Sequence, residues 1–152
     1  MPFYTQVKSI NNIIADSTPD INHSVSGAII VRMIAGVTMN FGDLCYINSD
    51  GEAQIGDADA EETSRVVVVA LESISADTTG KFALIDGGGI LRDDSWNWST
   101  KGAKLYLSTT GTTGNTWTDT APSGPDDAIV NVGIVLSATT IILTRLSVVE
   151  HI

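Results

Sequence analysis

The 152-residue sequence predicts an all-β domain, a small β-barrel or β-sandwich of about eight to ten short strands. Three observations lead to this fold class. Short runs of aliphatic and β-branched residues recur along the chain, the clearest being residues 65–71 with four consecutive valines. Turn residues separate these runs, as residues 48–51 do. After residue 23, no segment repeats its apolar residues at helical spacing.

Residues 1–23 differ from the rest, and we assign them to an N-terminal arm that precedes an all-β domain of residues 24–152. Their apolar spacing suits one face of a short helix, but an extended arm could equally pack the same side chains one by one. Pro19 ends any helix, because it holds Thr18 in an extended conformation. The apolar residues of the arm are candidates for contact with a neighbouring protein, although packing on the same subunit is an equal alternative: Phe3, Tyr4, Val7, Ile10, Ile13 and Ile14.

The first strands follow in order. Residues 27–34 form a continuous apolar run, which predicts a strand buried on both faces. Residues 44–47 predict a second strand, and residues 52–55 its hairpin partner across the turn at 48–51, where Gly51 permits a positive φ. The valine run at 65–71 predicts a central strand covered on both faces.

Residues 77–80 predict a turn before the alternating segment 81–86. This alternation places Phe82 and Leu84 on one face and Ala83 and Ile85 on the other. The glycines at 87–89 that follow lack the Lys and Ser or Thr of a P-loop and the spacing of a dinucleotide loop. They therefore predict a bulge, a sharp bend or a close backbone approach.

Two tryptophans, Trp96 and Trp98, stand two residues apart and fall on one face if the segment is extended. We expect both to be structural, packing beneath a strand at 105–107 or across a subunit boundary, since aromatic rings bury large apolar areas. Residues 109–120 suit an extended surface hairpin with Trp117 folded back onto the body, and residues 128–137 and 140–149 predict the last two strands. The candidates for core or subunit-interface packing are Trp96, Trp98, Tyr106 and Trp117.

The composition excludes several partners. The net charge is −10 with only eight scattered Lys and Arg residues, which disfavours binding to nucleic acid and to anionic membranes. Charged residues make up 17% of the chain, against about 25% in typical domains, which indicates that further surface is buried against a partner. No signal peptide or apolar run of membrane-spanning length is present, so we expect the protein to be made in a cytoplasm.

No residue pattern predicts an enzyme, a metal or a cofactor. The single cysteine, Cys45, lies in an apolar run and is expected to be buried. His23 and His151 lie near opposite ends of the chain, and no histidine is near the tryptophan segment in sequence. The acidic residues at 56–62 lack EF-hand spacing, which favours a solvated loop over a calcium site. The carboxylate pairs 93/94 and 126/127 would point to opposite faces of an extended chain and cap turns.

The segment Asp93-Asp94-Ser95-Trp96-Asn97-Trp98, followed by Leu105-Tyr106-Leu107-Ser108, resembles a pattern of small bacteriophage virion proteins. These are the capsid decoration (cement) proteins of tailed phages and the related head-fibre and tail-fibre β domains. Residues 42–51, 121–124 and 132–141 resemble the same proteins, so the resemblance covers residues 25–145. Its motifs are packing and turn motifs and imply no catalytic residue.

The resemblance implies a structural virion protein, made in the bacterial cytoplasm, that binds the outer capsid surface and stabilises contacts between capsomers. The implied partners are the major capsid protein and two further copies in a homotrimer, with no small-molecule substrate. The N-terminal arm would then contact the capsid or a neighbour. The alternative is a fibre domain that recognises a host-surface glycan or protein, in which Trp96 and Trp98 would stack on sugars. The short chain without a repetitive shaft favours decoration.

Overall fold

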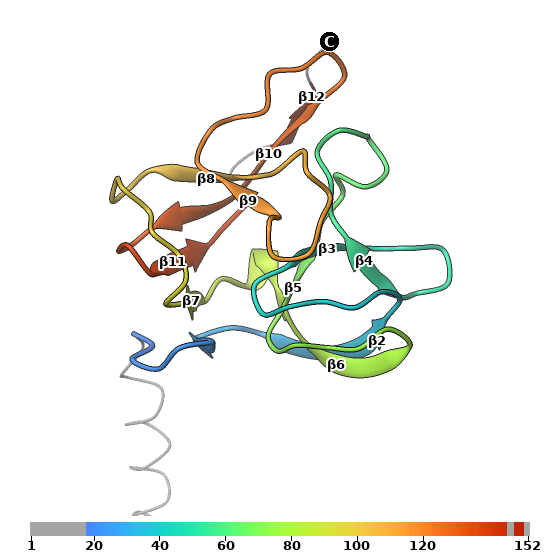
Figure 1. The fold of residues 1–152 in the computed structure, drawn as a ribbon, viewed down its shortest axis with the longest axis horizontal. Coiled ribbons are helices and arrows are strands. Elements are labelled where there is room, and N and C mark those ends of the chain that lie inside the picture. The colour runs from blue at the N-terminus through green and yellow to red at the C-terminus, as the bar shows by residue number, and fades with distance from the viewer. Residues whose placement is uncertain (1–17, 146–147, 151–152) are drawn as a thin grey trace, which may run out of the picture.

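A computed structural model describes residues 18–145 and the backbone of residues 148–150 (Figure 1). The arm candidates Phe3, Tyr4, Val7, Ile10, Ile13 and Ile14 and the second histidine, His151, lie outside the described residues. The described part is all-β, as predicted, with one short 3-10 helix, η1 (Ile85–Gly87). No helix in these residues is long and apolar enough to cross a membrane.

Five strands close into a small barrel in the order β2-β4-β3-β5-β6. The pairing is antiparallel except between β2 and β4, which run parallel. The barrel forms the right-hand lobe in Figure 1. Its strands are β2 (Ile30–Ala35), β3 (Leu44–Ile47), β4 (Ala53–Ile55), β5 (Val68–Ala70) and β6 (Thr78–Leu84).

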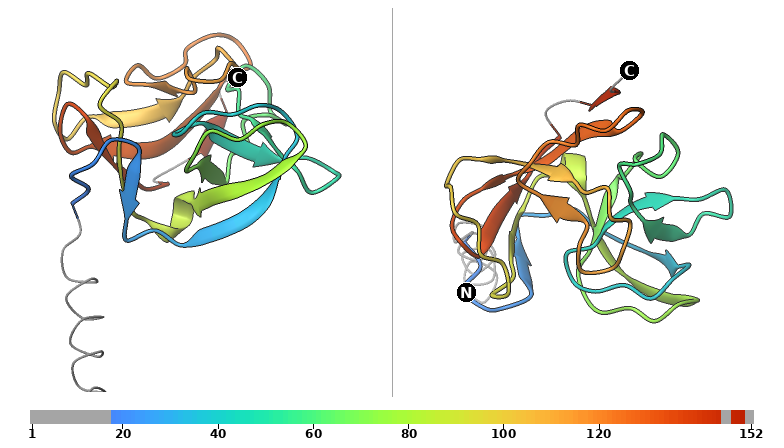
Figure 2. Two further views of the ribbon diagram at one scale, coloured as in Figure 1. Left: turned by 60° about the horizontal axis from the view of Figure 1, so that its bottom comes forward. Right: turned by 45° about the horizontal axis from the view of Figure 1, so that its top comes forward.

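The other strands form a seven-stranded sheet in the order β1-β7-β11-β10-β8-β9, with β12 added to β10. Figure 2 shows this sheet beside the barrel from two further sides. Several of its strands have only two or three residues, so the strands outnumber the eight to ten expected. They are β1 (Ser24–Ser26), β7 (Ile90–Arg92), β8 (Lys104–Leu107), β9 (Trp117–Thr118), β10 (Ala128–Val135), β11 (Thr140–Leu143) and β12 (Val148–Glu150).

The barrel is an insertion in this sheet. β1 precedes the barrel and β7 follows it, yet the two pair antiparallel, with Ser24 opposite Arg92 and Ser26 opposite Ile90. The chain enters the barrel at Ile30 and leaves it beside Ala83, the Cα partner of Ile30. The two ends of the inserted segment are therefore adjacent.

Two hydrophobic cores result from strand alternation. Phe82, in β6, belongs to the cluster inside the barrel, with Leu84 packed against that cluster. Ala83 and Ile85 point the other way, into the cluster between barrel and sheet, so the predicted alternation of this segment is confirmed. β5 alternates likewise: Val68 faces the barrel interior and Val69 the second cluster, which confirms a strand covered on both faces.

The predicted strand at residues 27–34 is wrong in two respects. Gly27 has a φ of +66°, and residues 27–29 connect β1 to β2, so the strand begins only at Ile30. Moreover, β2 is covered on one face only, since the side chains of Ile30, Arg32 and Ile34 are exposed. The sheet covers outer residues of β3, β5 and β6, such as Leu44, but no described residue of β2 belongs to that cluster.

The turns were predicted with mixed success. The hairpin of β3 and β4 is confirmed, with Gly51 at φ +82°. The turn at 77–80 is wrong, because β6 already begins at Thr78 and only Asp77 takes a positive φ. The expected last strand at 140–149 is two strands, β11 and β12, which pair with different parts of β10.

Candidate functional site

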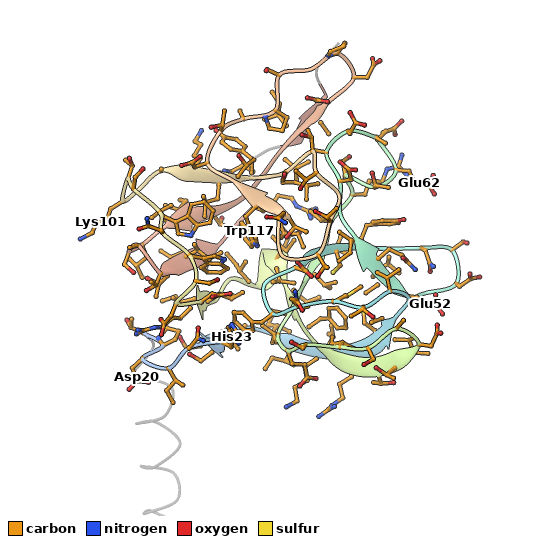
Figure 3. All side chains as sticks on the ribbon, in the orientation of Figure 1. Asp20, His23, Glu52, Glu62, Lys101 and Trp117 are labelled. Atoms are coloured by element: carbon orange, nitrogen blue, oxygen red, sulfur yellow. The ribbon has the colours of Figure 1, made fainter. Side chains whose placement is uncertain are left out.

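A cavity of about 350 Å³ lies where the barrel loop at residues 40–43 meets the turn after β7 and the strand β9. Figure 3 labels two of its residues, His23 and Trp117, which come from opposite parts of the chain. The cavity combines aromatic rings with carboxylates and small polar groups. Its lining is His23, Asn40, Phe41, Gly42, Asp43, Ser73, Asp93, Ser95, Trp96, Gly114, Thr116 and Trp117.

The three tryptophans form one cluster beside this cavity. The ring centroid of Trp96 lies 6.2 Å from that of Trp98 and 6.1 Å from that of Trp117. All three are partly buried against the core between barrel and sheet. The Trp117 indole N–H donates to the carbonyl oxygen of Gly42 at 2.6 Å, which ties β9 to the barrel loop. Tyr106, by contrast, lies in β8, half-buried, and does not line the cavity.

Asp43 fixes the barrel side of the cavity. It is 1% exposed, and its Oδ2 accepts hydrogen bonds from the Asn40 N–H at 2.8 Å and from the Thr113 hydroxyl. Its Oδ1 accepts from the Gly114 N–H at 2.7 Å. The carboxylate thus joins the barrel loop to the loop before β9, and both of its oxygens are occupied by protein donors.

His23 and Asp93 face each other on the side of the cavity formed by the sheet. Because Ser24 pairs with Arg92, the register of β1 and β7 places the preceding His23 opposite the following Asp93. The two side chains come within 3.6 Å, Nε2 to Oδ2, and the imidazole stacks on Phe41 with centroids 5.0 Å apart. The absence of a nearby histidine, read from sequence distance, is therefore corrected: the sheet brings one to the tryptophan segment.

The grouping of His23, Asp93 and Ser95 is not arranged as a nucleophilic triad. The Ser95 hydroxyl donates to Asp93 Oδ1 at 2.6 Å, so its proton points to the carboxylate. Within residues 18–145, no hydrogen bond joins this hydroxyl to His23, the contact that would activate a serine.

The described residues contain neither an exposed cysteine thiol nor a cluster of metal ligands. Cys45 is fully buried in the barrel, as predicted, where burial and then the nearby charge of Asp43 raise the pKa of its thiol. The described residues contain no group of three or more His, Cys, Asp or Glu side chains able to hold a metal ion. The acidic segment 56–62 is a loop, in which Glu61 pairs with Arg65.

The carboxylate pairs behave as predicted. Asp93 is buried while its neighbour Asp94 is exposed and pairs with Arg92 at 2.7 Å. Asp127 is buried and accepts the Gly124 N–H at 2.7 Å, whereas Asp126 is exposed. In each pair the buried member caps a turn, so neither pair shares one substrate position.

A second feature is the outer surface of β2 and β6, which we call the β2 face and define as Ile30, Arg32, Ile34, Thr79 and Lys81. Ile30 is 52% and Ile34 43% exposed. Cross-strand partners share a side of the sheet, so Lys81, the partner of Arg32, and Thr79, the partner of Ile34, lie on the same face. The exposure of this face was not predicted from the sequence, because a continuous apolar run predicts a strand that is buried on both faces.

Neither protein-family models nor curated proteins gave a match to this chain.

Proposed function

We propose that the protein is a structural virion protein, a decoration protein that binds the outer surface of a tailed-phage capsid and stabilises contacts between capsomers. The observation that carries this proposal is the exposed β2 face. The resemblance of residues 25–145 to phage decoration proteins supplies the partner, the major capsid protein.

The energetics of the β2 face favour a protein partner. Burying a large aliphatic side chain contributes about 1.5–3 kcal/mol, so two half-exposed isoleucines leave a substantial hydrophobic gain unused in the single chain. The isoleucines alternate along one strand on the outside of the closed barrel, which is a rigid, convex platform. Such a platform fits another folded protein better than it fits a small ligand.

The charges on the β2 face indicate the chemistry of the partner surface. Arg32 and Lys81 are direct cross-strand partners, a like-charge placement that costs stability in the isolated protein. Neither forms an ion pair in the described residues, although the chain carries a net charge of −10. A capsid surface with carboxylates around an apolar patch would relieve this repulsion.

The test is rebinding of purified protein to capsids from which it has been removed. The double variant Ile30→Ser/Ile34→Ser should fold normally, because both side chains are already exposed, and should rebind at least about tenfold more weakly. Leu136→Ser is the matched control, since Leu136 is an exposed aliphatic residue, 38% accessible, outside the β2 face. Rebinding of the double variant at the affinity of the control would refute the docking role of this face.

A further inference from the structure

We propose that the cavity beside the tryptophan cluster binds an alkylammonium or guanidinium group, the chemistry of a free amine or of a Lys or Arg side chain on a partner. This site is separate from the β2 face, and its occupancy does not depend on the decoration role.

The first observation is a carboxylate oxygen, on a largely buried residue, that accepts no hydrogen bond from the protein. Asp93 is 6% exposed. Its Oδ1 accepts two hydrogen bonds from Ser95, from the N–H at 2.8 Å and from the hydroxyl at 2.6 Å. Its Oδ2 lines up only with His23 Nε2, at 3.6 Å, which is beyond hydrogen-bonding distance. In the part of the chain that the structure describes, this oxygen receives no hydrogen bond.

A carboxylate oxygen that accepts no hydrogen bond from the protein can accept one from a ligand, and a charged donor gives the strongest such bond. Hydrogen bonds between ionised groups are shorter and about twice as strong as neutral ones. An N–H donor from a ligand in the cavity would therefore complete the coordination of Asp93. Asp43 adds negative potential from the opposite wall, although its own oxygens are already occupied by protein donors.

The second observation is the aromatic lining. The rings of Phe41, Trp96 and Trp117 border the cavity together with the two carboxylates. Aromatic faces attract cations, with a gain of about 0.5–2 kcal/mol per contact. The volume of about 350 Å³ lies at the lower end of the range of small-molecule sites, roughly 300–1,000 Å³.

The charge of the lining selects among ligand classes. No Lys or Arg lines the cavity, so an anion would meet two carboxylates with His23 as the one basic side chain in the lining. A neutral sugar could stack on the rings, but it would gain only uncharged hydrogen bonds to Asp93. A cation gains from the rings and from both carboxylates, which makes it the favoured ligand.

The experiment follows the indole N–H resonances of the full chain by NMR during titration. The small probes are n-butylammonium and methylguanidinium. The peptide probes are Ala-Lys-Ala and Ala-Arg-Ala blocked at both ends, with blocked Ala-Ala-Ala as the neutral reference. We expect the resonances of Trp96 and Trp117 to shift and that of Trp98, which does not line the cavity, to move least. The shifts should weaken as salt is added.

Two neighbouring carboxylates provide the matched variants. Asp93→Asn keeps an oxygen for Ser95 but removes the charge, and should weaken probe binding at least about tenfold. Asp94→Asn removes the same charge from an exposed neighbour and should change binding less than about twofold. Equal effects of the two variants, absence of shifts, or shifts with glucose and not with amines would overturn the proposal.

The probes also separate the two sources of the ligand. If n-butylammonium or methylguanidinium binds and neither peptide does, the natural ligand is a free small cation of the same chemistry. Binding of the Lys or Arg peptide, with no binding of the neutral peptide, supports a basic side chain of a partner.

Discussion

At the scale of single residues, Cys45 is a titratable thiol in a fully buried position. Its Sγ lies 3.5 Å from the Sδ of Met39 and 3.3 Å from the carbonyl oxygen of Asp43, inside the barrel. Burial is the main cause that raises the pKa of the thiol, and the charge of Asp43 adds to it. The native protein therefore keeps this thiol neutral at a pH where an unfolded chain would ionise it.

This difference predicts a loss of stability in alkali. The pKa of Cys45 is raised in the folded state, so its contribution is fully present below the unfolded value of about 8.5 and falls as the pH rises above it. The slope should reach about 1.4 kcal/mol per pH unit. When the free energy of unfolding is measured with denaturant between pH 7.5 and 10, it should fall more steeply with pH for the parent than for Cys45→Ala.

The comparison of the two proteins cancels the titration of other groups. Cys45→Ala should be less stable at neutral pH because it leaves a small cavity, but its stability should converge toward that of the parent in alkali. Parallel curves for the two proteins would contradict a neutral buried thiol.

The residues of the cavity and of the barrel core show which features could be predicted from the sequence. The tryptophans and the buried Cys45 were identified because their type and local setting are visible in sequence. The contact of His23 with Asp93 was not, because it depends on the pairing of β1 with β7 across the whole barrel. Ser95 was given no role from the sequence, since its role depends on which oxygen of Asp93 it contacts.

At the scale of elements, the local pattern predicted the side-chain alternation of β6, the two-sided burial of β5 and the hairpin of β3 and β4 correctly, because each is specified by its own residues. The start of β6 was placed three residues too late, at Lys81 instead of Thr78. The one-sided burial of β2 could not be predicted in the same way. An apolar strand has the same sequence pattern whether its outer face packs on another sheet of its own chain or on another protein. The error at β2 thus falls on the strand that we propose as the docking surface.

The glycine bend between η1 and β7 carries a further prediction. Gly89 has a φ of +117°, and a Cβ placed on it would lie 2.8 Å from the Cβ of Ala28. Gly89→Ala should therefore lower the midpoint of thermal unfolding strongly, since it combines backbone strain with a clash against backbone and side chain.

The neighbouring Gly88 separates these two causes. It has a φ of +74°, but a Cβ there meets nothing within 4 Å. Gly88→Ala should thus cost only the backbone strain, about 1–3 kcal/mol, and less than Gly89→Ala. Equal melting temperatures for the two variants would show that the close approach to Ala28 has no energetic consequence.

At the scale of the whole molecule, we predict a homotrimer. The low fraction of charged residues and the resemblance to virion proteins favour an assembly, and three-fold positions are common in icosahedral shells. Light scattering should give three times the mass of the 16.0 kDa chain. A stable monomer at micromolar concentration would contradict this for the free protein.

The insertion of the barrel between β1 and β7 has a consequence for how the chain folds. Closing β1 onto β7 directly would require a loop through all of residues 27–89, with a large loss of chain entropy. Folding of the barrel first brings Ile30 beside Ala83 and reduces that loop to two short connections. We therefore expect the barrel to fold before β1 pairs with β7, and the cavity with His23 and Asp93 to be assembled after the barrel has closed.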